Sequence, residues 1–186
     1  EDKVARRGLR VMDLLDPTAL AERLAELASY HNFMLEKYHE VEGISYESVL
    51  NDLLEASKKI SPLIRDVAAD LAHHSQLNHP ILFEGAQGTW LDVDMGTYPY
   101  VTSSNTTAGA AATGTGVGPL AFHYILGIAK AYTTRVGAGP FLTELTDEIG
   151  QHMGEKGQEF GSVTGRPRRC GWLDAVSLRR AIEMNS

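Results

Sequence analysis

The chain has 186 residues, of which 43% are apolar and 22% charged, and this is enough for one well-packed globular domain. Its formal net charge of −7 disfavours nucleic acid and anionic membranes as partners, since both require a broad basic surface. A single cysteine excludes an internal disulfide, no apolar run approaches the roughly 20 residues that cross a bilayer, and together these features favour a cytoplasmic setting.

The first third of the chain is predicted to be helical. Asp16 and Pro17 are typical of a helix start, because a capping carboxylate precedes a proline at the first helical position. A stripe at helical spacing follows, formed by Leu20, Leu24, Leu27, His31, Leu35 and Tyr38. Ser45 predicts the start of a second helix, and Ser61-Pro62 predicts the start of a third. We therefore expect residues 1–79 to form a basic N-terminal segment and a helical subdomain.

The remaining residues, 80–186, predict an α/β core segment. Residues 81–83 are a short apolar run of the kind found in buried strands, and residues 124–136 predict a second, longer strand. Two more helices are expected near residues 147–155 and 173–185. This mixed order predicts an α/β fold in which helices flank a sheet.

A stretch rich in glycine and hydroxyl side chains, residues 84–119, follows the first predicted strand. Glycines let backbone N–H groups approach a ligand and hydroxyls supply short donors, so the stretch suits a phosphate-bearing small molecule. Gln87 has an amide that suits a purine 6-oxo group and its neighbouring ring nitrogen, although a glutamine that ties two loops together is an equal alternative. For Thr102, the alternatives are a phosphate contact and an ordinary turn or cap.

Four sequence segments carry a resemblance to a known enzyme family. They read FEGAQGT from Phe83, GTYPYVTSSNTTAG from Gly96, RVGAGPF from Arg135 and TGRPRRCGWLD from Thr164. In this order they resemble adenylosuccinate synthetase, and the resemblance covers nearly the whole chain. It implies a cytoplasmic homodimer that uses GTP and Mg²⁺ to phosphorylate the purine 6-oxygen of IMP. L-Aspartate then displaces phosphate to give adenylosuccinate, a step of de novo AMP biosynthesis.

The resemblance also implies roles for particular residues. Gln87 would contact the base of IMP and orient it for catalysis, and Thr102 would bind the 5′-phosphate. Arg6, in the basic opening segment, would reach in trans across the dimer interface to the partner's IMP phosphate, and the alternative is a solvated basic terminus. Val136 would line the ribose side of the pocket through its backbone, where the alternative is a core valine.

Several parts of such an enzyme are not recognisable in this sequence. There is no G-x-x-x-x-G-K-S/T loop, and the resemblance implies that the GTP, Mg²⁺ and aspartate sites lie outside the chain. We therefore expect a partial domain from the centre of a larger enzyme, inactive alone, with no metal site or tightly bound cofactor. The alternative is a noncatalytic nucleotide-binding or dimerisation module. An RNA-binding module would depend on Arg166, Arg168 and Arg169, which we instead expect to pair with acidic side chains.

Overall fold

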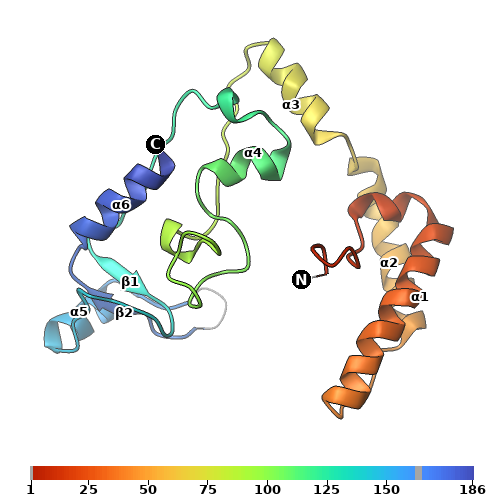
Figure 1. Ribbon diagram of the computed structural model, residues 1–186, viewed down its shortest axis with the longest axis horizontal. Coiled ribbons are helices and arrows are strands. Elements are labelled where there is room, and N and C mark those ends of the chain that lie inside the picture. Colours follow the sequence, from red (N-terminus) through yellow and green to blue (C-terminus); the bar gives the residue numbers. More distant parts are fainter. Residues whose placement is uncertain (1, 162–164) are drawn as a thin grey trace. The chain divides into compact units, whose positions relative to one another are not determined.

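The chain forms two compact units in the computed structural model, which describes residues 2–161 and 165–186 (Figure 1). The first unit extends up to Asp66, and the second runs from Val67 to Ser186. Each unit has its own set of secondary-structure elements. The domain boundary expected between residues 79 and 80 stays a prediction.

The first unit is built from helices. They are η1 (Val11–Leu15), α1 (Pro17–Phe33), the π-helical turn η2 (Met34–Tyr38), α2 (Tyr46–Ile60) and the 3-10 turn η3 (Ser61–Leu63). The Asp16 carboxylate caps α1 by accepting hydrogen bonds from two backbone N–H groups of its first turn, and the Ser45 hydroxyl caps α2. Leu20 and Leu24 of the predicted apolar stripe are buried. The first two predicted helices are therefore confirmed.

The third helix does not begin where the sequence predicts. Ser61 and Pro62 start only the short turn η3. The residue that follows this turn, Ile64, has a ψ of 122°, which lies outside the helical region. A separate helix, α3 (Val67–Gln76), then begins the second unit. The predicted start at Ser61-Pro62 is thus wrong, although a helix does follow within a few residues.

The second unit combines helices with a small sheet. After α3 its elements are η4 (Thr89–Leu91), α4 (Gly109–Thr115), η5 (Pro119–Ala121), β1 (Thr133–Arg135), α5 (Glu148–Lys156), β2 (Arg169–Gly171) and α6 (Ala175–Asn185). β1 and β2 are antiparallel, and α5 packs against β2 (Figure 1). The two predicted C-terminal helices are confirmed as α5 and α6, and the α/β class with an N-terminal helical part is also confirmed. None of the described helices combines the length and apolar character needed to span a membrane.

The strand predictions were less successful than the helix predictions. Residues 81–83 form no strand, and the Leu82 side chain is 88% exposed. Within residues 124–136 only β1 is a strand, and Ile128 is 91% exposed. An apolar segment becomes a strand only when a neighbouring strand accepts its backbone hydrogen bonds. Among the described residues, the sheet consists of β1 and β2, and no strand lies beside residues 81–83 or 124–132. The strand predicted at 81–83 and most of the strand predicted at 124–136 are therefore wrong.

Candidate functional site

Before α4, the glycine-rich stretch of residues 84–119 forms a loop. This glycine-rich loop is organised around one buried carboxylate, Asp92, which is 0% exposed. Its Oδ1 accepts hydrogen bonds from the backbone N–H groups of Asp94 at 2.9 Å and Met95 at 3.0 Å. Its Oδ2 accepts from the backbone N–H groups of Thr106 at 2.6 Å and Thr107 at 3.2 Å. One side chain therefore joins the two sides of the loop.

These hydrogen bonds keep Asp92 in its charged form. Burial alone raises the pKa of the Asp92 carboxyl, but the backbone hydrogen bonds outweigh burial and hold the pKa well below its ordinary value. Asn105 Nδ2 adds a hydrogen bond to Oδ1 at 3.2 Å. The backbone donors around Asp92 are thus used to shape the loop and not to bind a ligand.

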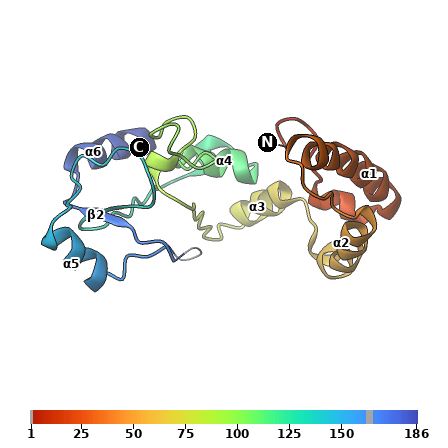
Figure 2. The same ribbon diagram turned by 90° about the horizontal axis from the view of Figure 1, so that it is seen from below.

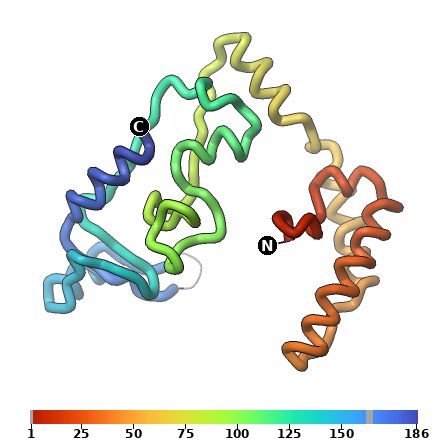
Figure 3. The backbone as a smooth tube through the Cα atoms, viewed as in Figure 1, coloured from red at the N-terminus to blue at the C-terminus, as the bar shows by residue number. Residues whose placement is uncertain are grey.

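Further hydrogen bonds fix the path of residues 88–106, which fold back on themselves in Figure 3. The backbone N–H of Thr102 donates to the carbonyl of Leu91 at 2.8 Å. The Thr106 hydroxyl donates to the carbonyl of Gly88 at 2.8 Å. The segment that carries Thr102 is therefore fixed by one main-chain hydrogen bond and one hydrogen bond from a threonine hydroxyl.

Helix α6 is tied to the same loop. Asn185, in its last turn, accepts a hydrogen bond at Oδ1 from the N–H of Ala108 at 2.7 Å and donates from Nδ2 to Thr89 Oγ1 at 3.0 Å. Ala108 is the residue before α4, so the C-terminal end of α6 lies beside the start of α4 in both views (Figures 1 and 2). The loop is thus attached to the helical part of the second unit.

Gln87 and Thr102 lie in this one loop region. Gln87 is exposed and has a φ of 64°, in the left-handed region that residues other than glycine seldom adopt. Strained backbone of this kind often occurs at ligand sites. Thr102 is half-buried, and its backbone is held by the contact with Leu91. Their contacts with IMP stay predictions.

Val136 and Arg6 lie in different parts of the chain. Val136 directly follows β1 and is 46% exposed, so a core valine, the alternative for this position, does not describe it here. Arg6 belongs to the first unit, is exposed, and donates from Nη1 to the Val4 carbonyl at 2.8 Å. The ribose contact of Val136 and the action of Arg6 in trans stay predictions.

In the basic cluster near the end of the chain, Arg168 and Arg169 pair with acidic side chains, as predicted. Arg168 Nη1 lies 2.9 Å from Glu159 Oε2. Arg169 makes a two-point ion pair with Glu144, in which Nε lies 2.6 Å from Oε1. Thr164, in the same sequence segment, lies outside the described residues. The pairing of Arg168 and Arg169 within the chain disfavours RNA binding by this cluster.

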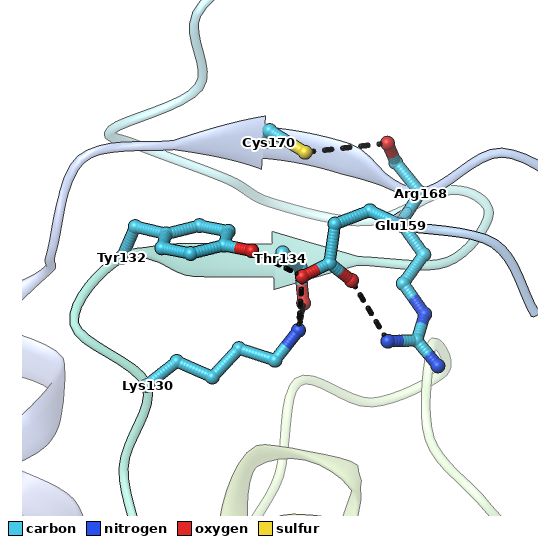
Figure 4. Close-up of polar contacts among 6 residues, drawn as sticks. All are labelled: Lys130, Tyr132, Thr134, Glu159, Arg168 and Cys170. Carbon is cyan, nitrogen blue, oxygen red and sulfur yellow. Dashed lines mark hydrogen bonds and ion pairs between the residues drawn. The ribbon is translucent and has the colours of Figure 1, made fainter. Parts of the chain in front are cut away.

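Glu159 is a second buried carboxylate, 5% exposed, and it gathers three partners (Figure 4). Its Oε1 accepts hydrogen bonds from Lys130 Nζ at 2.6 Å and the Tyr132 hydroxyl at 2.5 Å, and Oε2 pairs with Arg168. Burial alone raises the pKa of Glu159, but the hydrogen bonds from these partners outweigh it and lower the pKa to about 2. Glu159 therefore links the chain before β1 to the chain before β2.

Replacing Glu159 with glutamine is expected to reduce the stability of the second unit at neutral pH. The variant's stability should also fall less steeply with decreasing pH than that of the wild type. The folded-state pKa of Glu159 is lowered, so its contribution is present above the ordinary pKa of 4.5 and is lost as pH falls to about 2. Urea unfolding at several pH values between about 7 and about 2 measures this difference. Glu148→Gln, at an exposed position of α5, is the control. Parallel pH curves for wild type and Glu159→Gln would contradict the prediction.

Sequence reasoning did not single out Asp92 or Glu159. Asp92 stands in the run WLDV, and a carboxylate between apolar residues is a usable signal because its burial requires several compensating hydrogen bonds. No comparable pattern surrounds Glu159. Its partner Lys130 is distant in sequence, so only the folded structure reveals that cluster.

Within residues 2–161 and 165–186, no three side chains of the His, Cys, Asp and Glu types come together as metal ligands. The oxygens of Asp92 and Glu159 are occupied by N–H and O–H donors, so neither carboxylate is available for coordination.

The whole chain is similar to proteins of one family. The family model described as adenylosuccinate synthetase matches residues 1–186. The chain is 60% identical, over its full length, to the adenylosuccinate synthetases of Coxiella burnetii (strain RSA 493 / Nine Mile phase I) and Azotobacter vinelandii. It also matches, over its full length, the structure of fully ligated adenylosuccinate synthetase from Plasmodium falciparum, with a TM-score of 0.93 and 38% identity.

These matches place the chain among the ligases. More narrowly, the chain belongs to the adenylosuccinate synthetase family. It spans 43% of the length of the Coxiella, Azotobacter and Plasmodium proteins that it matches.

Proposed function

We propose that this chain supplies much of the IMP-binding site of an adenylosuccinate synthetase, which joins IMP and L-aspartate with GTP as the phosphoryl donor. The observation that carries the proposal is the loop held in shape by Asp92, in which the segments FEGAQGT and GTYPYVTSSNTTAG are both intact. A preformed loop of glycines and hydroxyls suits a nucleoside monophosphate, because its donors need little ordering when the ligand binds. The full-length enzyme acts in the cytoplasm as a homodimer in purine biosynthesis.

Four residues of the chain have roles in this proposal. The Gln87 amide donates to and accepts from the 6-oxo edge of the purine, and this orients the 6-oxygen toward the γ-phosphate of GTP without proton transfer by Gln87. The Thr102 hydroxyl binds the 5′-phosphate, and Arg6 from the second subunit adds charge-assisted hydrogen bonds to the same group. The backbone at Val136 lines the ribose.

The GTP, Mg²⁺ and aspartate sites belong, in this proposal, to parts of the full-length protein outside this chain. When bound, Mg²⁺ would neutralise charge on the GTP phosphates during phosphoryl transfer. The sequence has no P-loop, the usual cradle for the phosphates that carry this ion. The 186-residue chain alone is therefore expected to synthesise no adenylosuccinate.

A calorimetric titration of the chain with IMP is expected to give saturable binding, whereas inosine, which lacks the phosphate, gives little heat. Thr102→Val keeps the side-chain shape but removes the hydroxyl, so it is expected to weaken IMP binding by about tenfold. Thr146→Val, at an exposed position outside residues 84–119, is the matched control. Equal binding of IMP and inosine would contradict the phosphate role, and adenylosuccinate synthesis by the chain alone would contradict its expected inactivity.

A chimera tests the ligase activity itself. In it, this chain replaces the matching residues of the C. burnetii synthetase, with which it shares 60% identity. The chimera is expected to form adenylosuccinate only when IMP, L-aspartate, GTP and Mg²⁺ are all present. A folded chimera that binds IMP but makes no product would favour the alternative, a noncatalytic nucleotide-binding or dimerisation module.

A further inference from the structure

We infer that Arg135 is a positioning residue, whose guanidinium sets the spacing between the Thr102 side and the Val136 side of the proposed IMP pocket. The inference rests on the proposed function, because that function places IMP between these two segments. Arg135 is the last residue of β1, and Val136 follows it directly. Thr102 lies two residues after Tyr100, to which Arg135 is bonded.

The guanidinium of Arg135 makes hydrogen bonds in two directions. Toward the loop, Nη2 donates to Thr97 Oγ1 at 2.9 Å and to the Tyr100 carbonyl at 3.0 Å. Toward the turn after β1, Nε donates to the Ala138 carbonyl at 3.0 Å and Nη1 to the Pro140 carbonyl at 3.3 Å. One planar group therefore joins two segments that are about forty residues apart in sequence.

The turn after β1 is shaped to receive this side chain. Gly139 has a φ of 112°, and a Cβ atom at this position would overlap the Arg135 guanidinium. From β2, Arg169 Nη1 donates to the carbonyls of Gly137 at 3.1 Å and Gly139 at 3.0 Å, which fixes the other side of the turn. Because the turn fixes Arg135 in place, the guanidinium in turn holds the loop at Thr97 and Tyr100.

The segment bonded to Arg135 also contacts the part of the loop near Gln87. The backbone N–H of Thr97 donates to the Trp90 carbonyl at 3.0 Å, and Trp90 lies three residues after Gln87. Movement of Thr97 would therefore also disturb the segment that carries Gln87. A lysine cannot replace this arrangement, because its single ammonium lacks the planar fork that lets arginine bond in two directions at once.

Steady-state kinetics of the complete chimeric enzyme test the inference. Arg135→Gln is expected to raise the KM for IMP by about tenfold or more, because hydrogen bonds from a charged group are lost. The KM for GTP should stay within about twofold of the value for the unsubstituted chimera. Arg135→Lys keeps the charge and part of the hydrogen bonding. Its KM for IMP is expected to lie between the values for the unsubstituted chimera and Arg135→Gln. Arg180→Gln, at an exposed position of α6, is the matched control. It is expected to leave the KM values for IMP, GTP and aspartate unchanged.

Each outcome decides between the alternatives. A KM for IMP within about twofold of the unsubstituted chimera would overturn the role of Arg135. So would a parallel rise in the KM values for IMP, GTP and aspartate with a fall in melting temperature, because that pattern shows general destabilisation. The unsubstituted chimera is measured first: if it does not use IMP, the proposed function itself fails, and that result is distinct from a failure at Arg135.

Discussion

Replacing Asp92 with asparagine is expected to lower the free energy of unfolding of the second unit by about 3 kcal/mol and to open the glycine-rich loop. The substitution preserves the shape of the side chain, so the effect comes from hydrogen bonding and charge. Each carboxylate oxygen of Asp92 faces two backbone N–H groups. An asparagine amide would turn its NH₂ group toward one of these pairs, and donors would then face donors in a fully buried position.

Hydrogen exchange locates this effect within the molecule. In Asp92→Asn, the amides that donate to the carboxylate should exchange faster, and these are the amides of Asp94, Met95, Thr106 and Thr107. Amides in α1, which belongs to the other unit, should be unchanged.

The matched control is Asp94→Asn in the same loop. Asp94 is exposed and accepts a hydrogen bond from Asn105 Nδ2 at 2.6 Å, so its substitution should cost less than about 1 kcal/mol. Equal unfolding free energies for Asp92→Asn and wild type, or equal effects of the two substitutions, would refute the view that Asp92 organises the loop.

Opening the loop should also affect the proposed ligand site. Thr102 depends on the main-chain contact with Leu91, which lies next to Asp92 in the chain. A looser loop would have to be ordered when IMP binds, and this ordering lowers affinity even though no direct contact with IMP is lost. Asp92→Asn should therefore weaken IMP binding in the calorimetric titration.

Helices were predictable here because their signals are local. Asp16 and Ser45 each cap the helix that follows them, and the first of these precedes Pro17 as the pattern requires. Asp147 and Asp174 likewise cap α5 and α6. A cap acts within one turn, so sequence alone contains the information.

Strands and buried charges were less predictable because they depend on distant partners. The apolar run at residues 81–83 has the composition of a strand, but pairing requires a neighbour that no local pattern supplies. Helix α4 was missed for the opposite reason, since Gly109 and its neighbours look like loop residues although the chain there is helical. The resemblance could point to Gln87 and Thr102, whereas the Arg135 and Glu159 networks join residues distant in sequence and emerge only when the chain is folded.

Removing the side chain of Gln87 is expected to reduce turnover of the chimeric synthetase by about a hundredfold, with little change in melting temperature. The reason is geometric, because an IMP base that is not held in line with the γ-phosphate reacts rarely, and small misplacements cost rates of this order. Glycine is the most informative substitution. Gln87 has a φ of 64°, which glycine adopts without the Cβ strain that glutamine and alanine both carry, so a fall in turnover would come from the lost amide and not from added backbone strain.

Gln158→Gly is a closely matched control, since Gln158 is also an exposed glutamine with positive φ, in its case 50°. Its side chain donates to the Glu155 carbonyl and has no role in the proposed site. Turnover should fall in Gln87→Gly and stay unchanged in Gln158→Gly, while both variants melt near the wild-type temperature. Near-normal turnover in Gln87→Gly would remove Gln87 from the site, and its strained backbone would then require another explanation. Low turnover at an unchanged melting temperature would instead mean that the strain at Gln87 is tolerated because it presents the amide to the base.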